Sequence, residues 1–249
     1  MEYFFKRYEE KYLVNREQSA ALRDLLTRRM VPDRYGEYWV QNLYFDTENW
    51  DIIRASLEKP AYKEKMRLRG YGAARPESEL YLELKKKYKG LVYKRRCAVP
   101  ARSYAAGAAR DMVAGGESQI RREMDFYFRA HAVRERVFIS YKRTAYAGTD
   151  DAGLRVTFDT DARFRLNNLD FNNPRDGRAF LARDTAVMEI KTPAGIPMWL
   201  ARALGELRVY PAPFSKYGVC YTEHIRAARV PSVYGKERDE PCLISSTPA

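Results

Sequence analysis

The fold of this 249-residue chain is decided by the stretch Lys65-Met66-Arg67-Leu68-Arg69, in which basic and apolar side chains alternate. Side chains of a β-strand point to opposite faces of the sheet with a period of two residues. The stretch therefore predicts a strand with three cations on one face and two apolar side chains on the other.

The same alternation recurs in five further segments: Arg7-x-Glu9-x-Lys11, Glu83-x-Lys85, Tyr141-x-Arg143, Arg155-x-Thr157-x-Asp159 and Glu189-x-Lys191. The opposite face of these strands is assigned to apolar residues, namely Met66, Leu68, Leu82, Leu84, Ile139, Val156, Phe158, Met188 and Ile190. One such strand is typical of any antiparallel sheet with a wet face. Like charges that face each other destabilise a sheet, so six strands with a mostly basic face indicate a bound polyanion.

The composition agrees with an acidic partner. The chain has 45 Lys and Arg against 33 Asp and Glu, a formal net charge of +12 that is spread over the whole sequence. Nucleic acid, an anionic membrane surface and a phosphate-rich molecule are the partner classes that this charge favours. With 45% hydrophobic residues the chain has enough apolar surface for a core. We expect residues 1–230 to form one domain and residues 231–249 a flexible tail.

The cysteines predict a reducing environment. The chain has three of them, Cys97, Cys220 and Cys242, without a CxxC pair, which favours neither a disulfide framework nor a zinc site. The N-terminal residues are charged, and no run of about 18 apolar residues follows anywhere. We therefore expect a cytoplasmic protein without a transmembrane segment.

Strands and helices are both predicted from periodicity and turn residues. We expect strands at 3–13, 40–45, 61–71 and 186–192, and long hairpins at 79–98 and 135–164. A capping box formed by Asn15 and Gln18 predicts a helix with Leu22 and Leu26 on its buried face. Further helices are expected after Asp46, at 101–114, 117–131 and 197–208, and within 214–228.

An ordered set of motifs between residue 3 and about residue 221 then resembles a known family. The motifs are Arg7-Tyr8-Glu9-x-Lys11-Tyr12, Leu43-Tyr44-Phe45-Asp46-Thr47, Arg67-Leu68-Arg69, Leu82-Glu83-x-Lys85, Tyr141-x-Arg143-x-Ala145-Tyr146, Leu154-Arg155-Val156-Thr157-Phe158-Asp159, Met188-Glu189-x-Lys191 and Phe214-Ser215-Lys216-Tyr217. Together they resemble the VTC domain, the polyphosphate polymerase domain of the vacuolar transporter chaperone complex and its bacterial relatives. This domain is one of the triphosphate tunnel metalloenzymes, a CYTH-like superfamily.

The resemblance implies an α+β fold, a closed antiparallel β-barrel with helices packed outside. The basic strand face would then line a tunnel, and the apolar face would lie against the helices. A water-poor cationic tunnel binds phosphates more strongly than the same residues on an open surface, because the effective dielectric constant is lower.

The resemblance also implies which residues bind the substrate. By position they are Lys11, Arg67, Arg69, Lys85, Lys94, Tyr141, Arg143, Ser215 and Lys216. Five of these would be catalytic, namely Arg67, Arg69, Lys85, Arg143 and Lys216. The planar fork of arginine binds two phosphate oxygens at once, whereas lysine supplies a compact charge. Judged without the resemblance, each of these basic residues is equally well explained as part of a solvated strand face.

Glu189 resembles the metal-binding glutamate of the family, which implies Mn²⁺ or Mg²⁺ as cofactor. One or two carboxylates suffice when phosphates supply the remaining oxygen ligands. Glu9 and Glu83 are further candidates for metal contact. An ion pair with Lys11 or Lys85 is an equally good interpretation of these two carboxylates.

Two positions depart from the family patterns. The hydrolytic tunnel enzymes carry Glu-x-Glu-x-Lys on the first strand, and here the first position is Arg7, which disfavours a two-metal hydrolase. The eukaryotic polymerase has a lysine just before Phe-Ser-Lys, where this chain has Pro213. One phosphate contact of that enzyme would therefore be missing.

The function implied is a metal-dependent polyphosphate polymerase that transfers the γ-phosphoryl group of ATP to a growing polyphosphate chain. The alternatives are hydrolysis of inorganic triphosphate or nucleoside triphosphate, and a non-catalytic module that binds polyphosphate. ATP and inorganic polyphosphate or triphosphate are the expected partners. Nucleic acid is not expected, because the aromatic residues form no recognisable base-stacking motif. His131 and His224 lie in predicted helices and are expected to pack there.

Overall fold

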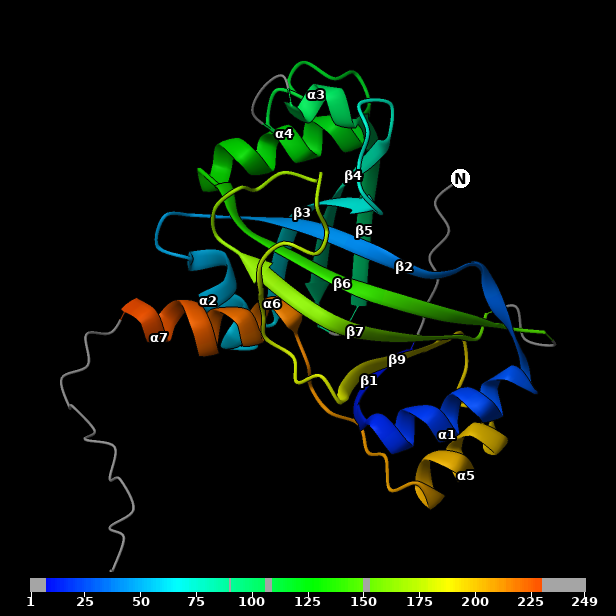
Figure 1. Ribbon diagram of the computed structural model, residues 1–249. Helices are drawn as coiled ribbons and strands as arrows, with labels where there is room; N and C mark the ends of the chain where they lie inside the picture. The colour runs from blue at the N-terminus through cyan, green and yellow to red at the C-terminus, as the bar shows by residue number, and fades with distance from the viewer. Residues whose placement is uncertain (1–7, 90, 106–108, 150–152, 230–249) are drawn as a thin grey trace, which may run out of the picture.

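The computed structural model describes residues 8–89, 91–105, 109–149 and 153–229. Within these residues nine strands form one antiparallel sheet, in the order β1-β9-β7-β6-β2-β3-β4-β5, with β8 paired to β7 (Figure 1). The strands are β1 (Tyr8–Asn15), β2 (Met30–Asp46), β3 (Tyr62–Tyr71), β4 (Glu79–Tyr88), β5 (Leu91–Pro100), β6 (Arg134–Gly148), β7 (Arg155–Arg165), β8 (Arg178–Ala179) and β9 (Thr185–Thr192). The strands and both long hairpins predicted from the sequence are therefore present in the described residues, and the part of the first predicted strand before Tyr8 lies outside them.

The prediction of a closed barrel is wrong, because the sheet is open. In the described part of the chain β1 pairs with β9 alone and β5 with β4 alone, so both are edge strands. Alternation of charge specifies which face a side chain takes, but closure needs backbone pairing between the two edges, which alternation does not encode. The open sheet is nevertheless strongly curved. Lys85 Nζ on β4 lies 3.8 Å from Glu9 Oε2 on β1, although five strands separate them in the sheet.

The two faces of the sheet differ as the alternation predicts. Arg67 pairs with Glu83 across β3 and β4, and the next pair along, Leu68 with Leu82, belongs to the opposite apolar face. We call the first surface the polar face. It carries Glu9, Lys11, Asn42, Tyr44, Lys65, Arg67, Arg69, Glu83, Lys85, Lys94, Arg96, Tyr141, Arg143, Thr157, Asp159, Glu189 and Lys191. The assignment of Ile139 is corrected, because it clusters with Tyr141 on the polar side.

Helices cover the apolar face in two groups. Met124 and Phe128 of α4 (Gln119–His131) pack with Met66 and Leu82 of the sheet. At the other end, α1 (Arg16–Thr27) and α5 (Met198–Glu206) pack on β1, β7 and β9. Figure 1 shows α4 at the top of the view and α1 beside α5 at the lower right. These two groups of helices thus lie outside the curved sheet, as expected.

Local signals in the sequence set some helix boundaries and miss others. The capping box at the start of α1 is formed as predicted, with Asn15 Oδ1 accepting a hydrogen bond from the Gln18 amide at 2.8 Å. The helix predicted at 101–114 is instead the short α3 (Ala101–Ala105), and residues 109–115 form turns. Met112 and Val113 still enter the core from these turns, so their apolar spacing is not evidence of a helix. None of the described helices has the length and hydropathy needed to cross a bilayer.

A third group of helices lies over one end of the polar face. It comprises α2 (Asp51–Leu57), α6 (Lys216–Val219), the π-helix η1 (Cys220–Ile225) and α7 (Arg226–Arg229). The buried carboxylate of Asp46 joins this group to β2. It accepts hydrogen bonds from the Ile52 and Ile53 amides at 2.9 and 3.0 Å and from the Tyr217 hydroxyl at 2.6 Å. Tyr217 also stacks on Tyr44 of the polar face, with ring centroids 4.6 Å apart.

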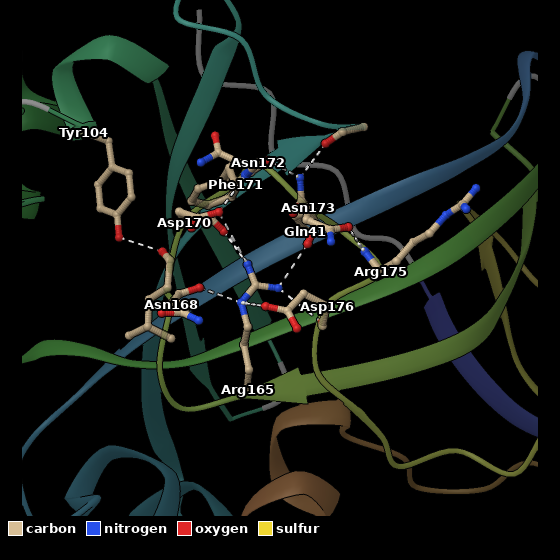
Figure 2. Close-up of polar contacts among 12 residues, drawn as sticks. Gln41, Tyr104, Arg165, Asn168, Asp170, Phe171, Asn172, Asn173, Arg175 and Asp176 are labelled. Atoms are coloured by element: carbon tan, nitrogen blue, oxygen red, sulfur yellow. Dashed lines mark hydrogen bonds and ion pairs between the residues drawn. The ribbon is translucent and has the colours of Figure 1, made fainter.

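One buried arginine, Arg165, holds the loop at 166–177 against the apolar side of the sheet. Figure 2 shows the guanidinium of Arg165 inside this loop. It donates hydrogen bonds to the backbone carbonyls of Asn168, Asp170, Asn173 and Asp176, at 2.6, 2.5, 3.2 and 3.2 Å. The hydroxyl of Tyr104 donates to the Leu169 carbonyl at 2.9 Å. Arg165 is therefore a structural residue of the loop.

Candidate functional site

The first cluster on the polar face is built around Glu83, whose side chain is 2% exposed. Arg67 donates to Oε2 through Nε at 2.9 Å and Nη2 lies 2.8 Å away, while Lys94 Nζ lies 2.5 Å from Oε1. Arg69 and Arg96 approach the same carboxylate at 3.8 and 3.6 Å. Burial alone would raise the pKa of Glu83, but Arg67, Arg69 and Lys94 lower it to about 2. One ionised carboxylate thus fixes several cations, and the cluster keeps a net positive charge.

A second cluster is built around the fully buried Asp159. Arg143 donates to both of its oxygens, from Nε at 2.6 Å and from Nη2 at 2.8 Å, and Lys216 Nζ lies 2.5 Å from Oδ2. Burial opposes ionisation of Asp159, but Lys216 and Arg143 hold its pKa below the ordinary value. Lys216 is the first residue of α6, which Ser215 caps by accepting a hydrogen bond from the Gly218 amide at 3.1 Å. Asp159 therefore ties the start of α6 to the sheet.

Tyr141 lies between these clusters. Its ring is 4.4 Å from Lys216 Nζ and 5.3 Å from the guanidinium carbon of Arg143. Burial raises the pKa of the Tyr141 hydroxyl, but Arg143 and Arg69 outweigh this effect and lower it overall. A hydroxyl in such a positive field is a strong hydrogen-bond donor to an anionic oxygen.

The third cluster contains the predicted metal ligand. Glu189 Oε1 lies 2.6 Å from Lys191 Nζ, and Lys191 and Lys11 hold the pKa of Glu189 well below its usual range against the effect of burial. Lys11 also donates to the Phe214 carbonyl at 3.2 Å. Thr157 pairs with Glu189 across β7 and β9, and its buried Oγ1 has no hydrogen-bond partner in the described residues.

These groups fit a metal that takes most of its ligands from phosphate. The described residues contain no group of three His, Cys, Asp or Glu side chains that could hold an ion. Glu189 is an ionised carboxylate beside an unpartnered hydroxyl, and both are oxygen donors of the kind that Mg²⁺ and Mn²⁺ accept. Glu9 and Glu83 form ion pairs instead: Glu9 lies 3.7 Å from Lys11 Nζ and 3.8 Å from Lys85 Nζ, and Glu83 has the cations described above.

Lysines on β3 and β4 complete the site. Lys85 is close to Glu9, and burial with the charges of Lys11 and Arg67 lowers its pKa despite that carboxylate. Burial and the neighbouring Lys63, Lys11 and Lys85 lower the pKa of Lys65 to about 8. Lys65 has no ion pair within the part of the chain described here, and its Nζ lies 5.8 Å from the Tyr217 ring.

The predicted site residues all lie on the polar face or at the start of α6. Arg67, Arg69 and Lys94 are gathered around Glu83, Arg143 and Lys216 around Asp159, and Lys11 beside Glu189. Sequence reasoning gave no role to Asn42, Tyr44, Lys65, Arg96 or Asp159. Lys65 and Asp159 stand in the charged alternations, and that signal could have identified them. The partner roles of Asn42 and Tyr44, which bind Arg69 and Arg67 at 3.0 and 3.2 Å, depend on the strand register.

The remaining predicted positions lie elsewhere. His131 Nε2 lies 2.7 Å from Glu64 Oε1 at the end of α4, and His224 stacks on Phe164, so both pack as expected. Arg7 lies outside the described residues. The segment around Pro213 runs along β1, where the Ala212 amide donates to the Lys11 carbonyl at 2.7 Å.

Solved structures with low similarity cover most of the chain. The PH1819 protein from Pyrococcus horikoshii OT3 is 13% identical and aligns over 86% of this chain and 97% of its own, with a TM-score of 0.44. The PH1012 protein of the same organism is 16% identical over 84% and 96%, with a TM-score of 0.40. A chain of the Schizosaccharomyces pombe Mediator head module is 8% identical over 81% and 90%, with a TM-score of 0.44. Likenesses at these scores support no inference about this chain.

A search of curated proteins returned no match. The family model of the VTC domain, in contrast, matches residues 6–224, which is nearly the whole chain. The family indicates a role related to polyphosphate in general. The chain therefore belongs to the VTC domain family.

Proposed function

We propose that this protein is a metal-dependent polyphosphate polymerase, which transfers the γ-phosphoryl group of ATP to the end of a polyphosphate chain. The observation that carries the proposal is a pair of buried arginines, Arg69 and Arg143, which neighbouring side-chain oxygens hold in place without using all of their donors. Arg69 donates through Nε to Asn42, and Arg143 through Nε and Nη2 to Asp159. Within the described residues the other guanidinium nitrogens of these two arginines have no hydrogen-bond acceptor.

Burial makes these spare donors effective toward phosphate. The side chains of Arg69 and Arg143 are 11% and 13% exposed. Two unit charges about 4 Å apart attract by roughly 1 kcal/mol in water but roughly 4 kcal/mol at an effective dielectric constant of 20. Because Asn42 and Asp159 already fix these arginines, little reorganisation is needed when charge develops on the transferring phosphoryl group.

The roles of the residues follow from their places on the polar face. Arg67, Arg69 and Lys94 around Glu83, and Arg143 and Lys216 around Asp159, would hold successive phosphates in line for attack by the acceptor oxygen. Tyr141 would donate its hydroxyl proton in a hydrogen bond to a phosphate oxygen between the two clusters. Glu189, with the Thr157 hydroxyl, would hold Mn²⁺ or Mg²⁺, which neutralises phosphate charge when bound. No covalent enzyme intermediate is required.

The test is incubation of the purified protein with ATP and Mn²⁺, followed by separation of phosphate chains by length and measurement of ADP. We expect chains longer than triphosphate and one ADP for each phosphate added. Arg143→Gln should abolish most chain growth, whereas Arg129→Gln, which alters an exposed arginine on α4, should not. Free phosphate without longer chains would indicate a hydrolase. Tight polyphosphate binding without any turnover would indicate a binding module.

A further inference from the structure

A row of four tyrosines extends the polar face at the end away from Tyr217. Tyr35, Tyr38, Tyr71 and Tyr81 come from β2, β3 and β4, and their neighbouring ring centroids are 6.0, 6.2 and 6.1 Å apart in edge-to-face contacts. Arginines lie over both ends of the row. The guanidinium carbon of Arg96 is 3.5 Å from the Tyr81 ring centroid, and that of Arg34 is 4.7 Å from the Tyr35 centroid.

The strand register places this row directly beside the phosphate-binding arginines. Tyr38 pairs with Arg143 across β2 and β6, and Tyr81 pairs with Arg69 across β3 and β4. Tyr71 follows Arg69 by two residues on the same strand face, about 7 Å further along β3. A triphosphate held by Arg69 and Arg143 would therefore have an aromatic surface within reach of a group attached to its end.

One of the two inner rings of the row, that of Tyr71, is open to a ligand and already fixed in place. Tyr71 is 44% exposed, although Tyr38 and Tyr81 contact it on both sides. A rigid aromatic side chain loses little conformational freedom when a ligand stacks on it. The hydroxyl of Tyr81 donates to Glu79 Oε2 at 2.8 Å and Arg96 lies over its ring, so Tyr71 is better placed than Tyr81 to stack on a ligand.

We infer that the row is the base-binding subsite of a nucleoside triphosphate, with the nucleobase stacked on Tyr71. The inference rests on the proposed function and adds to it the place of the donor nucleotide. Polyphosphate has no planar or apolar part that would use exposed rings, whereas every nucleobase has a π-face. The nucleoside of ATP then lies at the Tyr71 end of the polar face, and the phosphates extend from Arg69 toward Lys65 and Tyr217.

The experiment compares binding of ATP and of inorganic triphosphate in the absence of metal, by calorimetry, to the whole protein and to three variants. Tyr71→Leu removes the ring, Tyr71→Phe keeps it without the hydroxyl, and Tyr88→Leu alters an exposed tyrosine at the other end of β4. Stacking on one aromatic ring is worth about 1–3 kcal/mol per base, so Tyr71→Leu should weaken ATP binding about tenfold. The same variant should bind triphosphate within about twofold of the unaltered protein, and Tyr71→Phe and Tyr88→Leu should leave both affinities unchanged.

Retained triphosphate binding also shows that Tyr71→Leu is folded. Equal weakening of ATP and triphosphate, or no weakening of ATP, would overturn the inference and leave the proposed function standing. Failure of the unaltered protein to bind triphosphate would overturn the proposed function, and the base-binding subsite with it.

Discussion

Two buried arginines on neighbouring strands, Arg165 of β7 and Arg143 of β6, differ in how many of their donors the folded chain uses. All three nitrogens of the Arg165 guanidinium group donate to backbone carbonyls of the 166–177 loop. Arg143 commits two nitrogens to Asp159 and keeps the third without an acceptor in the described residues. Burial alone therefore does not identify an arginine of the functional site. We expect the number of donors left over after folding to identify it.

The largest effect is expected from replacing Arg165, the arginine whose three guanidinium nitrogens all donate to loop carbonyls. Arg165→Met should lower the free energy of unfolding by at least about 3 kcal/mol, because several loop carbonyls lose their donor and each costs about 1–3 kcal/mol when left unsatisfied. Urea denaturation measures the change. Arg155→Met on the same strand is the control, since this half-exposed side chain pairs with the Asp33 carboxylate and should cost under about 1 kcal/mol. Equal losses of unfolding free energy in the two variants would contradict the structural role given to Arg165.

The same comparison applies to carboxylates. Glu123 of α4 uses both oxygens, for Lys86 at 2.5 Å and Arg95 at 3.2 Å, whereas Glu189 uses Oε1 for Lys191. Glu189→Gln should reduce metal-dependent turnover roughly a hundredfold, equivalent to about 3 kcal/mol of transition-state stabilisation. Metal-free triphosphate binding should persist or tighten, because Lys11 and Lys191 lose a competing anion. Glu123→Gln should leave turnover within a few-fold, and an unchanged rate for Glu189→Gln would show that this carboxylate holds no metal.

The guanidinium donors that the fold leaves unused also predict how far added phosphates stabilise the folded protein. Triphosphate at a hundred times its dissociation constant should add about 2.7 kcal/mol and raise the melting temperature by several degrees. Monophosphate at equal concentration should do much less, because it reaches one cluster only. Arg69→Met should remove most of the triphosphate shift at little cost to the free protein, since it also relieves repulsion. A shift in the unaltered protein that disappears at physiological salt would indicate exposed charges, which are screened over about 8 Å.

The smallest effect concerns the pH at which the site binds phosphate. The pKa values of Lys65 and Lys94 are lowered to about 8, so these lysines lose their charge as the pH rises through that value, whereas the arginines do not. Triphosphate affinity should fall a few-fold between about pH 7.5 and 9, with proton uptake on binding that calorimetry in two buffers detects. Lys65→Met should flatten this dependence. Unchanged proton uptake in that variant would contradict a role for Lys65.

The stability of the free protein should change in the opposite direction over the same pH range. In the unfolded chain these lysines keep protons up to about pH 10.4, and in the folded chain they release them near pH 8. Because the unfolded state then binds more protons, the free energy of unfolding should rise with pH between about 8 and 9.5. Urea midpoints at several pH values measure this effect, and Lys65→Met should reduce it.

Periodicity in the sequence was enough to predict the polar face, because the position of each side chain on a strand depends on local alternation only. Arg67, Glu83 and Glu189 could be named for that reason. Closure of the sheet could not be predicted, since it depends on whether β1 and β5 meet. The tyrosine row was missed for the same kind of reason. Tyr38, Tyr71 and Tyr81 are far apart in sequence and become neighbours only through the register of three strands.

The open edge of the sheet has a consequence for how a long chain reaches the arginines. Across the described residues β1 and β5 share no backbone ladder, and the curved sheet is spanned by side-chain contacts such as Lys85 with Glu9 at 3.8 Å. Two strands joined by backbone hydrogen bonds separate slowly and cooperatively, whereas exposed lysine side chains change rotamer within picoseconds to nanoseconds. We therefore expect a polymer to enter sideways, through its middle as well as by its end. A polyphosphate blocked at both termini should compete with triphosphate for the site.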